Sequence, residues 1–108
     1  MHWILAHLIG DFLFQTDWMA RGKKNNSLAC LLHVATYMLP FLFTSFSPLQ
    51  LLCIAIQHFI QDRTTMVEWF MNHTGKRHFA QAPHTPWSLV IIDFIFHILA
   101  ISLIEKFL

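Results

Sequence analysis

Three polar side chains recur at every fourth position in the otherwise apolar stretch between His2 and Trp18. They are His7, Asp11 and Gln15. On an α-helix this spacing stacks side chains along one face, one turn apart. Because an unpaired charge in an apolar environment is strongly unfavourable, we expect these residues to meet polar partners from elsewhere in the chain.

The same one-turn spacing returns in three later apolar stretches. The pairs are His33 with Tyr37, His58 with Asp62, and Asp93 with His97. Each of four expected helices therefore carries one histidine, and in three of them an aspartate lies one turn away. Counted from the helix ends at about 1.5 Å per residue, most of these groups lie about 9–15 Å deep. Antiparallel packing would bring them to similar heights, so we expect one polar cluster.

Imidazole nitrogens and carboxylate oxygens are ligands for zinc, manganese or iron, and facing helices of a bundle can build such sites. We predict a divalent metal with the ligands His7, Asp11, His33, His58, Asp62, Asp93 and His97. These residues could hold one metal with supporting carboxylates, or two metals bridged by aspartate. Without a metal, each aspartate could instead accept a hydrogen bond from its histidine and fix the helix packing.

The elements that position these residues are expected to be membrane-spanning helices. Apolar residues make up 56% of the 108 and charged residues only 12%, about half the charged share usual in soluble domains. We therefore expect an all-α, integral membrane four-helix bundle in which residues 1–108 form a single transmembrane domain. The expected spans cover residues 2–20, 27–46, 48–66 and 86–106. A soluble but unusually apolar helical bundle is the alternative.

Local signals mark where these helices begin and bend. Ser27 is a reasonable N-cap for the second helix and Ser47, which precedes a proline, for the third. Pro40 lies inside the second span, so we expect a kink there that frees the carbonyl of Thr36.

Basic residues are distributed unevenly over the connecting loops. Six of the seven fall on one side of a four-span arrangement, and only Lys106 falls on the other. Because cytoplasmic loops are enriched in lysine and arginine, we expect both termini on the non-cytoplasmic side and the polar cluster open to the cytoplasm. The expected location is a membrane, among membrane lipids. Short spans in so small a chain also favour a homo-oligomer.

Several classes of function lack their usual sequence features. The formal net charge is only +1 and no basic stripe with interleaved aromatic residues occurs, so no nucleic-acid partner is expected. No glycine-rich phosphate loop, serine-centred elbow or CxxC motif is present. Cys30 and Cys53 lie in apolar runs and are expected to be packing residues. Nucleophilic catalysis by serine or cysteine therefore has no support.

The chain resembles a family of small bacterial and phage membrane proteins known as domain of unknown function 3307. The matching pieces are AHLIGDFLFQTDWMA, then Lys23 or Lys24, then LLHVATY, HFIQDR and IIDFIFH. They span nearly the whole chain and contain the polar positions described above. Members often carry glutamine directly after the aspartate of the last motif, where this chain has Phe94. The resemblance implies a polytopic membrane protein, expected in the bacterial inner membrane, and leaves the reaction open.

One functional hypothesis and two alternatives follow. We expect a metal-dependent hydrolase in which a metal-activated water attacks a lipid-linked or phosphate-containing substrate from the cytoplasmic side. Asp11 and Asp62 are predicted as catalytic carboxylates, and Gln15 and Tyr37 as substrate-positioning residues. The first alternative is an ion- or proton-conducting subunit that uses the same titratable groups as a relay. The second is a structural or interaction module whose polar network fixes helix packing.

Overall fold

Helices account for all the regular secondary structure of the chain. The computed structural model describes residues 1–108 and contains no β-strand. The α-helices are α1 (Trp3–Leu8), α2 (Asp17–Gly22), α3 (Ser27–Met38), α4 (Pro48–Arg63), α5 (Met66–His73) and α6 (Trp87–Phe107). A π-helical segment, η1 (Ile9–Leu13), extends α1, and a 3₁₀ segment, η2 (Pro40–Phe43), follows α3. The all-α prediction is confirmed.

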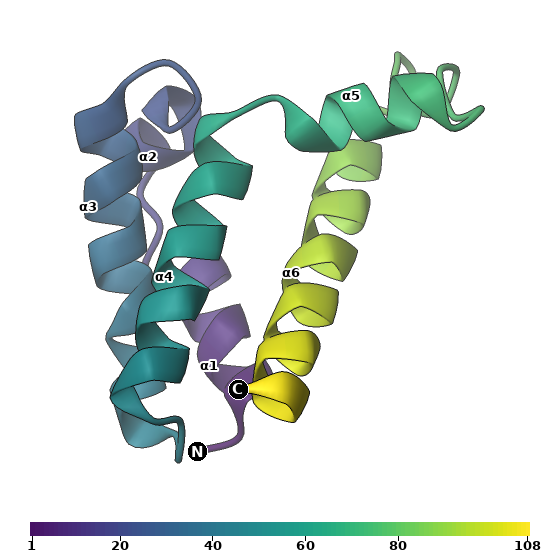
Figure 1. The fold of residues 1–108 in the computed structure, drawn as a ribbon. Coiled ribbons are helices and arrows are strands. Elements are labelled where there is room, and N and C mark those ends of the chain that lie inside the picture. The colour runs from purple at the N-terminus through teal and green to yellow at the C-terminus, as the bar shows by residue number, and fades with distance from the viewer.

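Four helices lie along the length of the molecule and two lie near one end of it (Figure 1). α1, α3, α4 and α6 form the long part, whereas α2 and α5 lie near the end opposite the two chain termini. We call this the α2/α5 end. α3 packs against α2 and α4, and α6 packs against α4 and α5. The two chain termini lie at the same end of the bundle (Figure 1).

The first helical stretch is interrupted, which corrects the expected continuous span over residues 2–20. α1 passes into the π-helical segment η1, this segment ends at Leu13, and α2 starts afresh at Asp17. Thr16 caps the new helix, because its hydroxyl accepts a hydrogen bond from the amide of Met19 at 3.3 Å. A strong local cap thus outweighs the continuous apolar pattern that predicted one long helix.

Gly10 brings the first stretch into close contact with α3. A Cβ atom at this position would lie 2.6 Å from the carbonyl oxygen of Tyr37 and 2.7 Å from its ring. Only glycine leaves room for this approach of one backbone to another. The following residue, Asp11, is thereby carried towards α3 on a π-helical turn, a feature often found at functional sites.

Two helix starts can be compared with their predicted caps. Asn26, not the predicted Ser27, caps α3, because its Oδ1 atom accepts a hydrogen bond from the amide of Leu28 at 2.9 Å. Asparagine caps a first turn as well as serine does, and here it lies one residue earlier. Ser47 caps α4 as predicted and forms a capping box with Gln50.

Pro40 ends an α-helix instead of kinking it. α3 stops at Met38 and the chain continues as η2, because a proline ring is incompatible with the preceding helical turn. The carbonyl of Thr36, predicted to be free, accepts a hydrogen bond from the amide of Leu39 at 3.3 Å. The tighter 3₁₀ geometry therefore satisfies this carbonyl.

One helix, α6, is long and apolar enough to cross a membrane. The apolar helical stretches Trp3–Leu13 and Ser27–Phe43 are shorter, and α4 ends at Arg63, before the predicted end of its span at residue 66. The helix lengths thus support the all-α class and one possible membrane helix. They do not by themselves show the expected four-span arrangement.

The main apolar core lies on the terminal side of the long helices. Its buried residues are Trp3, Ala6, Tyr37, Phe41, Ile54 and Ile101. They come from the halves of α1, α3–η2, α4 and α6 nearest the chain termini. Only 23 of the 108 residues are buried, so many apolar side chains of the long helices face outward.

Candidate metal centre

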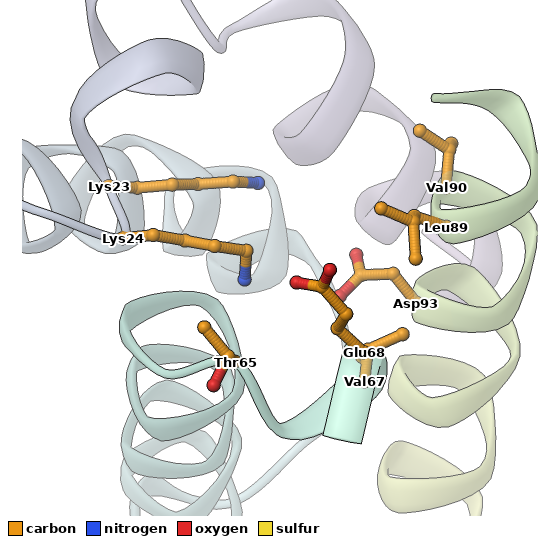
Figure 2. Close-up of a pocket in the computed structure, with 8 residues that line it drawn as sticks. All are labelled: Lys23, Lys24, Thr65, Val67, Glu68, Leu89, Val90 and Asp93. Carbon is orange, nitrogen blue, oxygen red and sulfur yellow. The ribbon is translucent and has the colours of Figure 1, made fainter. Parts of the chain in front are cut away.

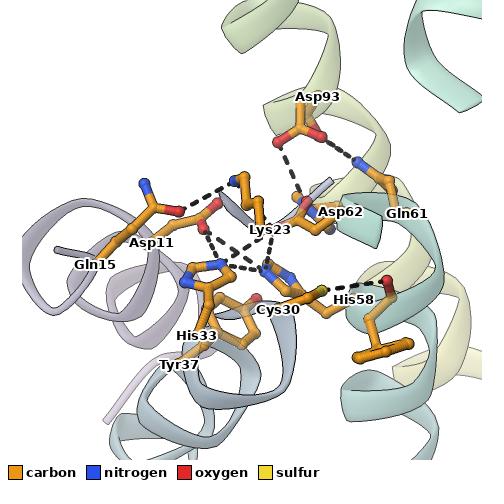
Figure 3. A network of polar contacts seen from close by, with 12 residues as sticks. Asp11, Gln15, Lys23, Cys30, His33, Tyr37, His58, Gln61, Asp62 and Asp93 are labelled. Atoms are coloured by element: carbon orange, nitrogen blue, oxygen red, sulfur yellow. Dashed lines mark hydrogen bonds and ion pairs between the residues drawn. The ribbon is translucent and has the colours of Figure 1, made fainter. Parts of the chain in front are cut away.

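Asp62 lies at the centre of a buried group of histidines contributed by three helices. Its Oδ2 atom is 3.0 Å from Nε2 of both His33 on α3 and His58 on α4 (Figure 3). Its Oδ1 atom is 3.1 Å from Nε2 of His97 on α6. All four residues are fully buried. One carboxylate therefore joins three helices through three imidazole rings.

Asp11 of η1 completes a compact set of four donor atoms with two of these histidines and Asp62. Its Oδ1 atom lies 3.1 Å from His33 Nε2 and 3.6 Å from His58 Nε2, and the two Nε2 atoms are 2.9 Å apart. A tetrahedral ion with bonds of about 2.0 Å needs its ligand atoms about 3.3 Å apart. The observed spacing therefore suits an ion such as zinc.

A second group of candidate ligands adjoins the first. Asp93 Oδ2 lies 3.4 Å from Nε2 of His97, one turn further along α6. With Asp11, these residues offer three ligand atoms that all lie within 4.8 Å of one another. His7 borders this group, because its Nε2 atom lies 3.8 Å from Asp11 Oδ2. All seven predicted ligands thus meet in one region, although their roles remain predictions.

Ring stacking fixes the orientation of the histidines. The ring of His58 lies between those of Tyr37 and His97, with centroid separations of 3.8 and 4.0 Å and nearly parallel planes. The hydroxyl of Tyr37 also lies 2.7 Å from Nδ1 of His7. These contacts restrict ring rotation and direct the Nε2 atoms of His58 and His97 towards Asp62.

Lys23, which was not predicted as a site residue, reaches the cluster from the turn after α2. Its Nζ atom lies 3.1 Å from Asp62 Oδ2 and 3.1 Å from Gln15 Oε1. Burial alone would lower the pKa of the Lys23 ammonium group, but the carboxylates of Asp62, Asp11 and Asp93 outweigh this effect and raise that pKa above its ordinary value. Lys23 is therefore a fixed positive charge beside the candidate ligands.

The turn that carries Lys23 is fastened to the end of α4 by reciprocal hydrogen bonds. Lys24 Nζ donates to the main-chain carbonyls of Asp62 at 3.2 Å and Thr64 at 2.9 Å. Arg63 donates in turn to the carbonyl of Lys24. Positive groups are favoured at the C-terminal end of a helix, where carbonyls lack partners. The turn is thereby held in place over the cluster.

Gln61 of α4 orients Asp93 of α6. Its Nε2 atom donates to Asp93 Oδ1 at 2.8 Å and to the Asp93 main-chain carbonyl at 3.0 Å, while its own Oε1 accepts from Gln57 at 2.7 Å. In the sequence, Gln57 directly precedes His58 and Gln61 directly precedes Asp62. The contact leaves Asp93 Oδ2 directed at His97.

With its histidines neutral, as metal ligation requires, the cluster carries more negative charge than its protein neighbours neutralise. The carboxylates of Asp11, Asp62 and Asp93 and the ammonium group of Lys23 sum to a formal charge of −2 (−3 + 1) when the histidines are neutral. In addition, His7 Nε2 is buried without a hydrogen-bond partner. Uncompensated buried charge and unpaired polar atoms are unfavourable within protein alone. The donor set and its charge fit a divalent cation.

A cavity of about 140 Å³ opens beside the cluster at the α2/α5 end. The ammonium groups of Lys23 and Lys24 extend into it from one side, opposite the carboxylates of Glu68 and Asp93 (Figure 2). A small polar molecule that entered here would meet Asp93 and Lys23, both members of the buried network.

A smaller cavity of about 80 Å³ shares Lys23 and Asp93 with the first. Gln15, predicted to position substrate, lines it together with Asp11 and Phe94. Tyr37, the other predicted positioning residue, is fully buried and lines neither cavity. The structure thus places Gln15 at an opening of the site and Tyr37 behind the histidines.

The fold and the cluster define a class: small all-α proteins with a buried histidine–aspartate centre that could hold a divalent ion. The chain belongs to the family described as "Protein of unknown function (DUF3307)", which it matches over residues 1–108. The resemblance to domain of unknown function 3307 is thereby confirmed. No curated protein and no solved structure matches the chain.

Proposed function

We propose that this protein is an integral membrane hydrolase that depends on a divalent metal and acts on a lipid-linked phosphate. The observation that carries the proposal is the convergence of buried donor atoms from Asp11, His33, His58 and Asp62, which all lie within 4.8 Å of one another. Zinc, manganese and iron suit this mixture of ligands. A bound divalent ion would supply Lewis-acid activation of water or of a phosphoryl oxygen.

Asp62 and Asp93 differ in exposure, so we assign them different positions in the site. The side chain of Asp62 is 1% exposed and is enclosed by three histidines and Lys23, so it acts as a ligand. The side chain of Asp93 is 22% exposed and lines the 140 Å³ cavity. Its carboxylate is the candidate ligand that a substrate entering this cavity would meet.

Two lysines favour a substrate that contains phosphate. The ammonium groups of Lys23 and Lys24 face the same cavity as Asp93 (Figure 2). Lys24 contacts main-chain carbonyls and has no carboxylate partner, so its charge is available to an anion. Lysine binds phosphate as a point charge. A phosphate group in the cavity would thus be held between the lysines and the candidate ligands.

An apolar groove next to the cluster favours a lipid-linked substrate. The groove has a volume of about 330 Å³ and runs between α4, α5 and α6, where Phe70, Phe96 and Leu99 line it. Gln61 also lines it and joins it to Asp93 through the hydrogen bonds described above. An acyl chain in this groove would bring an attached headgroup to the edge of the cluster.

The outer surface of the helices supports insertion into a membrane. α6 can cross a bilayer by length and composition, and Leu31 on α3, Ile56 on α4 and Ile95 on α6 are each about half exposed. The α2/α5 end carries the basic turns, so the positive-inside rule puts this end and its cavities on the cytoplasmic side. Under this proposal the shorter helices cross a locally thinned bilayer, or the chains associate.

The apolar core argues against the conducting alternative. A relay across the membrane needs polar groups from one side to the other. Here Trp3, Phe41, Ile54 and Ile101 fill the space between the polar cluster and the terminal side. The titratable groups instead form a site that is reached from one end.

The test is chelator-sensitive hydrolysis by the protein reconstituted into phosphatidylcholine vesicles that contain phosphatidate. We expect release of inorganic phosphate with zinc, manganese or iron, lost after chelation and in Asp62→Asn. Asp17→Asn, the same change at an exposed residue of α2, should retain activity. Absence of phosphate release with every metal would contradict the proposed reaction. Ion flux that survives chelation would support the conducting alternative.

A further inference from the structure

We infer that the centre is built for two divalent ions, bridged by the carboxylates of Asp11 and Asp62. This inference rests on the proposed metal-dependent function and specifies its metal site. It follows from the way in which the two aspartates distribute their oxygen atoms among four histidines from four helical elements.

Asp62 divides its two oxygens between separate histidine groups. Oδ2 faces His33 and His58, each at 3.0 Å, whereas Oδ1 faces His97 at 3.1 Å. A carboxylate that bound a single ion would need only one of its two oxygen atoms to face imidazole groups. Two oxygens that point at different imidazole groups are typical of a bridging ligand in a two-metal site.

Asp11 repeats this division independently. Its Oδ1 atom faces His33 at 3.1 Å and His58 at 3.6 Å, whereas its Oδ2 atom faces His7 at 3.8 Å. The four histidines therefore fall into two pairs, His33 with His58 and His7 with His97. Both members of the first pair face one oxygen of each aspartate, whereas in the second pair His97 faces Asp62 Oδ1 and His7 faces Asp11 Oδ2. Asp93, 3.4 Å from His97, adds a carboxylate to the second pair alone.

His7 provides a separate indication of a ligand at the second position. It is fully buried, and its Nε2 atom has no hydrogen-bond partner. Its Nδ1 atom lies 2.7 Å from the hydroxyl of Tyr37. Histidine ligands of metals commonly have one nitrogen held by a neighbouring polar group while the other faces the ion. Tyr37 thus positions His7 with its free nitrogen towards Asp11.

The charge of the cluster is consistent with two ions and an anionic substrate. One divalent ion would neutralise the formal −2 of the three carboxylates and Lys23. A second would leave the centre at +2, which would attract a phosphate group into the cavity beside Lys23 and Lys24.

The experiment measures metal per chain and magnetic coupling in detergent-purified protein loaded with Mn²⁺. We expect about two equivalents and an exchange-coupled electron paramagnetic resonance signal. Asp93→Asn removes a ligand of the second position alone, so it should bind about one equivalent with the signal of isolated Mn²⁺. His7→Gln should behave in the same way and serves if Asp93→Asn does not fold. The matched control Asp17→Asn should retain both ions.

The outcomes distinguish a failure of the two-ion inference from a failure of the proposed function. One equivalent in the unaltered protein, unchanged in Asp93→Asn and His7→Gln, would overturn the two-ion centre and leave a one-metal hydrolase intact. No bound Mn²⁺, Zn²⁺ or Fe²⁺ in any form of the protein would overturn both. Two equivalents without coupling, insensitive to both substitutions, would place the second ion elsewhere and overturn the inference alone.

Discussion

The ammonium group of Lys23 lies 3.1 Å from Asp62 Oδ2, the same oxygen atom that His33 and His58 approach to 3.0 Å. One carboxylate oxygen thus contacts both the ammonium group of Lys23 and two candidate metal ligands. A divalent ion at this oxygen and the Lys23 ammonium group would repel each other at short range. Lys23 therefore opposes metal binding electrostatically and stabilises Asp62 when no metal is bound.

Replacing Lys23 by methionine should raise the affinity for Zn²⁺ by about tenfold, because a nearby positive charge is removed. The same change should lower the free energy of unfolding of the metal-free protein, by up to about 3 kcal/mol, since the buried carboxylate of Asp62 loses one of its charged partners. Calorimetric titration with Zn²⁺ and thermal unfolding with chelator would measure the two effects. Lys24→Met, which removes a charge bonded only to main-chain carbonyls, should change the affinity less. Equal affinities in the two variants would contradict this role of Lys23.

Gly10→Ala should disrupt the centre through the backbone. Its Cβ would lie 2.6 Å from the carbonyl oxygen of Tyr37, so α1 and η1 must move away from α3 and carry Asp11 with them. We expect a loss of stability of about 1–3 kcal/mol together with weaker metal binding. Gly75→Ala is the control, because Gly75 has a φ of +80° but no atom within 4 Å of its added Cβ. It should lose stability and keep its metal; metal retention in Gly10→Ala would refute the positioning argument.

Gln61→Leu should weaken metal binding without removing a ligand. Gln61 holds Asp93 through hydrogen bonds to its carboxylate and its carbonyl, and loss of such a supporting group typically costs about 10- to 100-fold in metal affinity. Gln57→Leu, which removes only the contact of Gln57 with Gln61, should have a smaller effect. The affinities can be compared by competition with a chromogenic chelator. An unchanged affinity in Gln61→Leu would show that Asp93 does not need this support.

Ile95→Lys should impair membrane integration. Ile95 is half exposed near the middle of α6, and a lysine at the centre of a membrane helix costs about 2.5–3.5 kcal/mol on insertion scales. Phe107→Lys, the matched change at the helix end, should be tolerated because its ammonium group can reach the interface. Carbonate extraction of membranes would measure the integrated fraction of each variant. Equal integration would argue that this face of α6 does not contact lipid.

The helical spacing predicted the histidine–aspartate cluster better than it predicted the helices. His58 with Asp62 and Asp93 with His97 share faces because side chains four residues apart do so in any α-helix. The depth argument then placed most of the groups at similar heights, and the structure brings them together. For the first stretch this argument assumed a helix continuous to residue 20, which is wrong, but the one-turn spacing of His7 and Asp11 lies before the break and was unaffected by it.

Other features depend on contacts between distant segments and gave no local signal. Lys23 contacts Asp62 from a turn, where no helical periodicity applies. In the sequence, only its place among the matching family motifs distinguished it from other loop residues. The partner of Gln61 lies 32 residues further along the chain. The close approach of Gly10 to Tyr37 likewise arises from packing of α1 and η1 on α3. Such contacts become visible only when the chain is folded.

The most direct test of the account is the metal content of the detergent-purified protein, measured by elemental mass spectrometry beside His58→Ala. We expect zinc, manganese or iron at about one or two equivalents per chain, with a large loss in His58→Ala and none in His78→Ala, the same change at an exposed histidine. Protein that is metal-free and stays so after incubation with each of these ions would contradict the metal centre. The cluster would then be a hydrogen-bonded network that fixes helix packing.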